Sequence, residues 1–419
     1  MVLFYRPRRN IGSEEVLAGI GGPPNKWRFK RTNCPYSFLS VSDNRSSDLV
    51  LLFLLSLIRG RQRTLAMTQY QILVSSFTEE IYTLLFDDSK GTLGLVSKVQ
   101  VGHHPSWITF HPKDRSVVFA GLEQSDGKVA ELKFDQHGKG EVVGKVESGG
   151  RDPCSLLATK DELLVANYSS GVIRIIALAD STPYLTSSSR TIQFSGSGPN
   201  KERQEGSHPH QVVIIDDREE LLVPDLGADR VLRFKKGTDG DWNPCGHIQY
   251  ELGGGPRHIA YCNGELFTLL ELSSKVARHS FSPNLGSPEF ITSTATMSSP
   301  LPQPNDMLAA EILVPQSNSS FPTPYIYLSN RNDPSPAGDI ISIFDFTSDP
   351  NKLQLIAEVR SGLKHVRAIS FGGPDDKYLL AGGVSGGGVK VFERIDGGKG
   401  LKEVAKNEGV VAPTGFLWK

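Results

Sequence analysis

A phrase that returns with variation at intervals of about fifty residues is the feature that most constrains this fold. Clear copies begin at His104, Asp152, His208, Gly255 and His365. Each copy reads as an apolar strand, a polar turn, a second strand, a turn rich in Gly, Asn or Asp, and a third strand. Such a unit cannot bury both of its faces alone, so the copies must pack side by side. The repeat therefore indicates a β-propeller.

The number of blades follows from the openings of the repeat. They fall near Gln69, His104, Asp152, His208, Gly255, Ala309 and His365. The sequence thus predicts an all-β fold, a seven-bladed β-propeller. A closed ring requires one end of the chain to pair with the other, because otherwise two strand edges would be exposed. We expect the strand 410–418 to lie beside the strand that starts near Tyr70.

The first 66 residues do not follow the repeat. We predict that residues 1–66 are an N-terminal extension, disordered or wrongly assigned to the protein, and that residues 67–419 form the propeller domain. The apolar run Leu49–Ile58 is too short to cross a bilayer, which takes about 20 residues. A mitochondrial presequence is the alternative, because the first dozen residues contain arginines and no acidic residue.

The composition limits the kinds of binding partner and the cellular compartment that we expect. The 45 basic residues nearly balance the 46 acidic ones, so we expect neither a nucleic-acid nor a membrane partner. The four cysteines are scattered and form no CxxC pair, which argues against a zinc site and a disulfide framework. These features favour a cytoplasmic protein. They indicate no oligomeric state.

Polar side chains with catalytic chemistry stand at the openings and ends of the repeated strands. His208 and His210 are two residues apart, and hence on the same side of an extended segment. Arg257 follows three glycines and a proline, a stretch that lets a ligand approach closely. Glu271 ends an apolar strand, where desolvation would raise its pKa towards that of a general acid or base. Arg331 ends the matching strand of a later copy, and this joint set suits an anionic substrate that needs proton transfer.

The order of several motifs resembles one known family. HPHQVVIIDD, VPDLGADRV, GPRHIAY, LLEL, YLSNR and the terminal APTGFLW occur in sequence over residues 70–418. In this order they are similar to the seven-bladed propellers that include bacterial 6-phosphogluconolactonase and fungal 3-carboxy-cis,cis-muconate lactonizing enzyme. The resemblance implies an active site made of His210, Arg257, Glu271 and Arg331. We also predict substrate contacts from His208, Arg257, Arg331 and His258.

The resemblance leaves the reaction open between two alternatives. In a lactonase, arginines would bind the phosphate or carboxylate of a small anionic lactone while Glu271 or His210 deprotonates a water. In a cycloisomerase, the same arginines would hold a muconate while Glu271 or His210 protonates carbon. Neither reaction needs a metal or an organic cofactor, and we expect none. The favoured prediction is lactone hydrolysis, and a non-catalytic propeller that serves as a binding platform is the third possibility.

Two further expectations concern parts around the site. The insertion Ser195–Glu205 is rich in Ser, Gly and charge and is expected to be a mobile loop on one face. Glu271→Gln and Arg257→Ala are each expected to lower activity by more than about a hundredfold and leave the melting temperature nearly unchanged, because polar residues at a rim contribute little to core packing.

Overall fold

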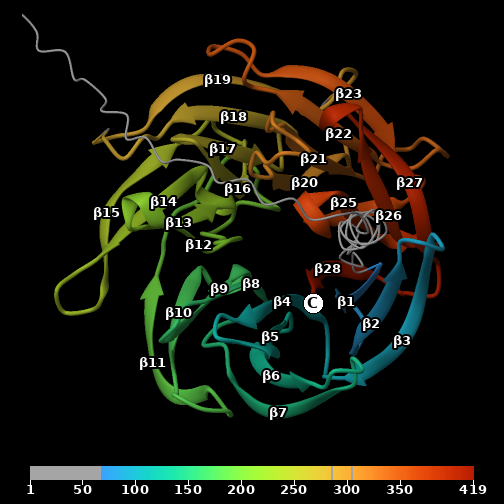
Figure 1. Ribbon diagram of the computed structural model, residues 1–419. Helices are drawn as coiled ribbons and strands as arrows, with labels where there is room; N and C mark the ends of the chain where they lie inside the picture. Colours follow the sequence, from blue (N-terminus) through green and yellow to red (C-terminus); the bar gives the residue numbers. More distant parts are fainter. Residues whose placement is uncertain (1–67, 285, 303–304) are drawn as a thin grey trace, which may run out of the picture. The chain divides into compact units, whose positions relative to one another are not determined.

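The computed structural model describes residues 68–284, 286–302 and 305–419. In this part of the chain, seven four-stranded antiparallel sheets are arranged radially around a central axis (Figure 1). The predicted seven-bladed β-propeller is confirmed. The predicted N-terminal extension, with its alternative as a presequence, lies outside the described residues. No helix of the described segments is long and apolar enough to cross a membrane.

Each blade runs from an inner strand at the axis to an outer strand at the rim (Figure 1). The inner strands are β4 (Pro105–His111), β8 (Pro153–Ala158), β12 (Val213–Ile215), β16 (Pro256–Cys262), β20 (Leu308–Leu313), β24 (Lys364–Gly372) and β28 (Pro413–Trp418). The second strands are β1 (Gln69–Ser76), β5 (Asp114–Leu122), β9 (Glu162–Asn167), β13 (Glu220–Asp225), β17 (Glu265–Leu270), β21 (Ile326–Arg331) and β25 (Tyr378–Gly386). The third strands are β2 (Glu80–Asp87), β6 (Lys128–Phe134), β10 (Val172–Leu178), β14 (Arg230–Lys236), β18 (Lys275–Ser280), β22 (Ile340–Asp345) and β26 (Gly388–Ile395).

Every blade has an outer fourth strand that the repeat did not reveal. These strands are β3 (Thr92–Gln100), β7 (Gly140–Glu147), β11 (Leu185–Gln193), β15 (Trp242–Gln249), β19 (Glu289–Ala295), β23 (Gln354–Arg360) and β27 (Gly400–Asn407). Their side chains are mostly exposed or half-buried, as in LTSSSRTIQ of β11. Because a strand at the rim buries little of its surface, it needs no apolar pattern, and the sequence carries no signal for it.

Both faces of each blade are buried against the neighbouring blades. In β12, Ile214 packs with blade 3 and Ile215 packs with blade 5. Successive residues of this segment thus face different neighbouring blades, and the core is a ring of layers between blades. This arrangement explains why the second strands are mostly buried, and why ELLVPD of β13 is buried along its whole length.

The ring closes as expected at the two ends of the propeller. β28 pairs antiparallel with β1, with Ile72 opposite Trp418 and Val74 opposite Phe416. Phe416 is buried, and the Trp418 ring packs edge-on against Tyr70 at 6.0 Å between centroids. The last strand of the chain thus serves as the inner strand of the first blade, and both edges are covered.

The inner strand of every blade contains one residue more than its partner strand near the point where it begins. At β16, Pro256 faces Leu270 and His258 faces Leu269, so Arg257 is the extra residue of a β-bulge. The same excess occurs in the other blades. We call the extra residues the bulge residues. The register identifies Ser106, Cys154, Arg257, Arg367 and Thr414, and His210 and Ala310 are assigned as the residues at the equivalent place in the other two blades.

A second set of equivalent residues lies beside the bulges. In each blade, the residue before the bulge pairs with a residue of the second strand, and the next residue along that second strand belongs to this set. We call these the strand-end residues. They are Phe77, Glu123, Tyr168, Leu226, Glu271, Arg331 and Val384. The backbone N–H of Glu271, for example, donates to the carbonyl of Gly255 at 2.8 Å, just before Pro256. The left-handed φ of 66° at Gly255 turns the chain into this contact.

We predict that removal of residues 413–419 destroys the cooperative fold. The deletion takes away the hydrogen bonds of β28 to β1 and the buried Phe416, and it exposes the edge of β1. The melting temperature followed by circular dichroism should fall by more than about 10 °C, or the protein should become insoluble. Deletion of Lys419 alone is the control and should change the melting temperature little. A truncated protein that melts like the full chain would contradict the closure.

Candidate active site

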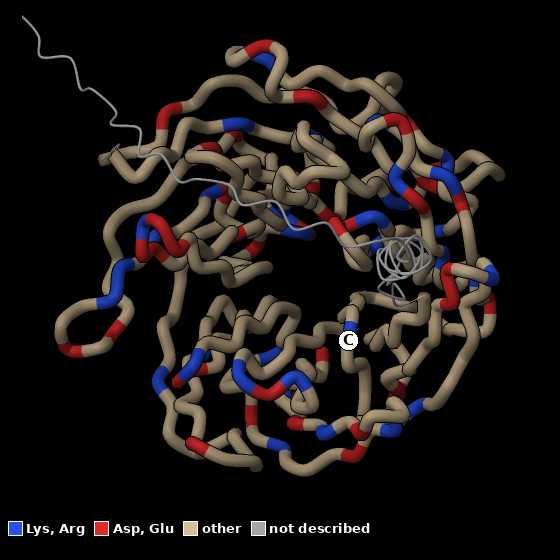
Figure 2. The backbone as a smooth tube through the Cα atoms, viewed as in Figure 1, with Lys and Arg blue, Asp and Glu red and all other residues tan. Residues whose placement is uncertain are grey.

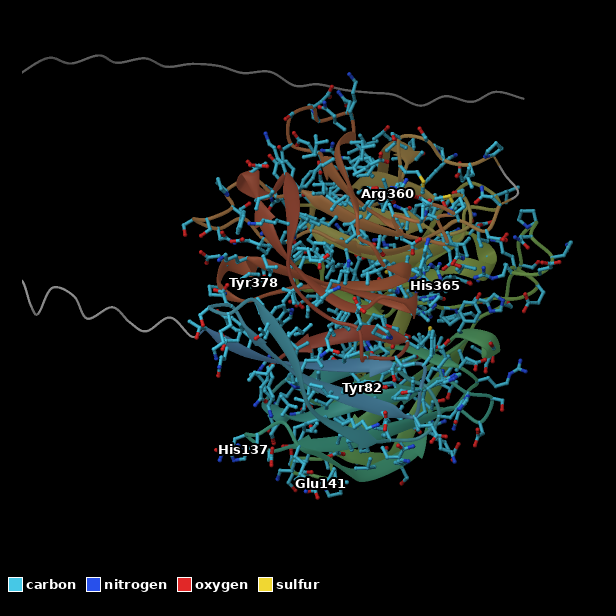
Figure 3. All side chains as sticks on the ribbon, turned by 90° about the vertical axis from the view of Figure 1, so that its right-hand side faces the viewer. Tyr82, His137, Glu141, Arg360, His365 and Tyr378 are labelled. Carbon is cyan, nitrogen blue, oxygen red and sulfur yellow. The ribbon has the colours of Figure 1, made fainter. Side chains whose placement is uncertain are left out.

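The bulge residues and strand-end residues converge on a cavity of about 210 Å³ where the inner strands begin. Seven of its lining residues come from these two sets, and one comes from the insertion before blade 4. They are Glu123, Cys154, Tyr168, Arg203, His210, Glu271, Arg331 and Arg367. In blade 7, His365, which precedes the bulge, and Tyr378, at the start of β25, lie at opposite faces of the ring (Figure 3).

Glu271 is the centre of the charge network. Its side chain is 2% exposed and meets three guanidinium groups. Arg203 Nη2 lies 2.5 Å from Oε1, whereas Arg257 Nε and Arg331 Nη2 lie 2.8 and 2.9 Å from Oε2. Burial alone would raise the pKa of Glu271, but the charges of Arg331, Arg257 and Arg203 outweigh it and hold the pKa well below its usual range.

The prediction of a raised pKa for Glu271 was therefore wrong. The sequence showed the apolar strand that desolvates the carboxyl group, but it did not show that three cations surround it. A carboxylate held in its ionised form is a poor general base and offers no proton as an acid at neutral pH. The role that the structure leaves to Glu271 is to order the arginines around it.

Arg331 and Arg257 differ in what they present to the cavity. Arg331 lines the cavity and donates from Nη2 to the carbonyl of Ala309 at 2.9 Å. Its buried Nε has no hydrogen-bond partner among the described residues. Arg257 is not a lining residue; it donates from Nη1 to the carbonyl of Ala310 and pairs with Glu271 through Nε. The two carbonyls that accept from the arginines lie where the register of β20 shifts, just after the pair Ala309 and Asn330.

His210 supplies a neutral imidazole to the same cavity. It is 4% exposed, and its backbone N–H donates to the Pro224 carbonyl at 2.9 Å. Burial and the nearby charge of Arg257 keep the pKa of His210 well below its usual range. Its Nδ1 has no hydrogen-bond partner within the described part of the chain. A neutral imidazole with a vacant ring nitrogen can accept a proton.

His208 and His258 stand behind the cavity wall. The ring of His208 stacks on Tyr168 at 4.3 Å, and its Nε2 lies 3.1 Å from Glu205. His258 Nδ1 lies 2.6 Å from Glu311 Oε1, and burial lowers the pKa of its ring in spite of that carboxylate. Neither residue lines the cavity, so the substrate contacts predicted for them find no geometric support.

The insertion Ser195–Glu205 is anchored, contrary to the expectation of a mobile loop. Gln204 is fully buried, and its Nε2 donates to Asp229 Oδ1 at 2.7 Å and to the Leu226 carbonyl at 2.9 Å. Asp229 also accepts from the backbone N–H of Gly253 and Gly255 at 2.7 and 2.9 Å. One carboxylate therefore fixes both the insertion and the glycine-rich stretch before Arg257. The hydrophilic composition of the insertion concealed these buried bonds.

Five lining residues were missed by the reading of the sequence. Cys154 and Arg367 are bulge residues, and Glu123 and Tyr168 are strand-end residues. Alignment of the copies HPS, DPC, HPH, GPR and HVR would have marked the bulge residues, since each is the third letter of its copy. Arg203 has no counterpart in other blades, and no periodic signal could have found it.

Positive charge exceeds negative charge at this site. Four guanidinium groups, those of Arg203, Arg257, Arg331 and Arg367, face the carboxylates of Glu123 and Glu271. Burial and the charge of Arg331 lower the pKa of the neighbouring His365 to about 4. Elsewhere on the ring, cations and anions alternate (Figure 2). The cavity is therefore suited to an anionic ligand.

The described residues contain no group of three or more His, Cys, Asp or Glu side chains placed to hold a metal ion. The thiol of Cys154 lies 3.6 Å from the carbonyls of Pro209 and His210, and burial raises its pKa far above the usual value. It is a protonated packing group and not a thiolate ligand.

The chain belongs to a family of enzymes described as lactonases with a seven-bladed β-propeller, whose model matches residues 71–418. A 6-phosphogluconolactonase of Formosa agariphila is 26% identical over 344 residues, which cover 78% of this chain and 93% of the relative. A 6-phosphogluconolactonase of Bacillus subtilis is 25% identical over 339 residues, 78% of this chain and 92% of the relative.

A solved structure shares the fold. The periplasmic gluconolactonase of Pseudomonas aeruginosa superposes with a TM-score of 0.70 at 21% identity, over 84% of this chain and 99% of that one. The predicted resemblance to the lactonase family is confirmed by these matches.

Because Glu271 is buried among arginines, its substitution is no longer expected to leave the melting temperature nearly unchanged. We predict that Glu271→Gln lowers the free energy of unfolding by about 3–5 kcal/mol at pH 7, because it leaves buried guanidinium groups uncompensated. Urea denaturation measures the change, and exposed Glu202→Gln in the insertion is the control.

The same variant gives a pH signature. A carboxyl group with a depressed folded pKa stabilises the protein above its ordinary pKa of about 4.5, and this contribution is lost as the pH falls through the folded value. The gap between wild type and Glu271→Gln should therefore persist from pH 7 to about 5 and shrink in stronger acid. A gap that stays constant in acid would contradict the ion-pair network.

Proposed function

We propose that this protein is a sugar lactone hydrolase that acts on a small anionic lactone such as 6-phosphogluconolactone. The observation that carries the proposal is the pairing, in one cavity, of a neutral imidazole and a buried guanidinium N–H, both without partners among the described residues. Membership of the lactonase family and the excess of positive charge support it. The imidazole of His210 supplies a base, and the Nε–H of Arg331 supplies a donor for developing negative charge.

The reaction proceeds by attack of water on the lactone carbonyl carbon. His210 accepts a proton from the attacking water as the new C–O bond forms, and the carbonyl oxygen becomes an oxyanion. Collapse of this intermediate breaks the bond to the ring oxygen, which takes the proton from the His210 imidazolium. The product is an open-chain hydroxy acid, and its carboxyl proton leaves to solvent. His210 returns to its neutral form for the next turnover.

Arg331 stabilises the oxyanion through Nε–H, and its position is fixed by Glu271 and the Ala309 carbonyl. A guanidinium in a buried site acts strongly because the surrounding dielectric is low. Arg257 is a positioning residue, because it holds Glu271 from behind the wall. Positive charge for carbonyl polarisation thus comes from side chains of this chain, and we propose that hydrolysis needs no metal.

No observation favours cycloisomerisation over hydrolysis. Protonation of carbon would require an acid at the cavity, and the pKa of Glu271 is held below its usual range. The unpaired cysteines Cys154, Cys245 and Cys262 support the proposal of a cytoplasmic location.

We expect His210→Asn to lower kcat by more than about 100-fold, because it removes the base. Stopped assays with 6-phosphogluconolactone, corrected for spontaneous hydrolysis, measure the effect. His137→Asn is the control, since His137 is exposed in the turn between β6 and β7 on the face away from the site (Figure 3). Activity of His210→Asn close to wild type would refute the role of His210.

The pH profile provides an independent check. Because the folded pKa of His210 lies well below 6.5, the base is already neutral at mildly acidic pH. We expect kcat/KM to stay level from pH 8 to 6 and to fall only at lower pH. A descending limb centred near pH 6.5 would point to a histidine of ordinary pKa and away from His210.

The hydrolase proposal itself is tested by the rate with 6-phosphogluconolactone in the presence and absence of EDTA. Fast hydrolysis that EDTA leaves unchanged is the expected result. Loss of the rate with EDTA, restored by a divalent cation, would replace the guanidinium mechanism with a metal-dependent one. A rate equal to the spontaneous one would reject this substrate.

A further inference from the structure

Arg203 is the one lining residue that the propeller repeat does not supply. It comes from the insertion Ser195–Glu205, and its backbone N–H donates to Asn200 Oδ1 at 3.1 Å. The adjacent Gln204 is fully buried and bonded to Asp229. The main chain at Arg203 is thus held in place, while its side chain extends to the cavity.

The exposure of Arg203 distinguishes it from the other arginines around Glu271. Its side chain is 36% exposed, against 2% for Arg257 and 4% for Arg331. Arg203 therefore stands where the cavity opens to solvent, Arg331 stands at its buried end, and Arg257 lies behind the wall. A substrate whose carbonyl reaches the buried end places its opposite end near Arg203.

Arg203 can also change partners at lower cost than the other two. It alone of the three pairs with Oε1 of Glu271, and Arg257 and Arg331 both pair with Oε2. Glu271 therefore keeps two guanidinium partners when Arg203 turns away. Arg257 and Arg331 are in addition tied to backbone carbonyls of β20. Arg203 also bonds to the side chain of Tyr168, so its more exposed guanidinium keeps one partner while it exchanges the carboxylate of Glu271 for a ligand anion.

We propose that Arg203 recognises an anionic group of the substrate remote from the lactone ring, and so sets the preference for charged over neutral lactones. This inference rests on the proposed lactone hydrolysis. The ligand chemistry is an oxyanion, a phosphate ester or a carboxylate, that accepts two N–H donors from one guanidinium. Arg203 is thereby a specificity residue, distinct from the groups that act on the carbonyl.

The test compares a phosphorylated and a neutral substrate. Arg203→Gln should lower kcat/KM for 6-phosphogluconolactone roughly 10- to 100-fold and change that for glucono-1,5-lactone by less than about threefold. Arg203→Lys should fall between, because it keeps the charge and loses the planar fork. Arg151→Gln is the matched control, since Arg151 is exposed and precedes β8. Within the described residues, its guanidinium donates only to the carbonyl of Ser169.

Two outcomes would overturn the proposal. An equal loss with both lactones would show that Arg203 acts through Glu271 on the reaction itself. An unchanged preference would show that Arg203 has no part in recognition.

Binding of the products separates failure of this inference from failure of the hydrolase proposal. Calorimetric titration with 6-phosphogluconate, glucarate and gluconate needs no turnover. Wild type should bind 6-phosphogluconate more tightly than gluconate, and Arg203→Gln should lose that difference. This result would support anion recognition even if neither lactone were hydrolysed, whereas equal affinity of wild type for all three would refute it. Tight binding of glucarate would extend the recognised group to carboxylates.

Discussion

The pairing of the last strand with the first is the contact on which the rest of this structure depends. Each blade buries both faces against its neighbours, so a ring with one open edge would leave two blades half-covered. β28 removes that edge by completing the first blade from the far end of the chain. Since inner strands from five successive blades supply or support the site, their convergence requires a closed circle.

Within that circle, the bulge is the device that turns a repeated strand into a site. An extra residue in the inner strand interrupts the alternation of side chains between the two neighbouring blades, so its own side chain points towards the central axis. The sequence made the fold predictable, because apolar strands at a fixed interval leave few architectures. It also made His210, Arg257, Glu271 and Arg331 predictable, because they recur at equivalent places in different copies. The structure joins Arg257 and Arg331 to the carboxylate of Glu271 and places His210, Glu271 and Arg331 on the wall of one cavity.

What the sequence could not predict depends on neighbours that are remote in the chain. The pKa of Glu271 is set by Arg203, 68 residues away, and by Arg331 in the next blade. A strand pattern reports the desolvation of a residue, but not the charges across the channel. The outer strands were missed for the opposite reason, since exposure removes the pattern itself. Arg203 was missed because an insertion has no repeat with which it can be compared.

The two circles of equivalent positions have a consequence for how such a protein can acquire new chemistry. Eight of the fourteen bulge and strand-end positions carry side chains without charge or imidazole, among them Ser106, Ala310, Leu226 and Thr414. The backbone already aims each of them, so a single substitution there introduces a functional group at a preset angle without a new loop. The scaffold of the ring can thus stay constant while its chemistry changes with the side chains at the bulge and strand-end positions.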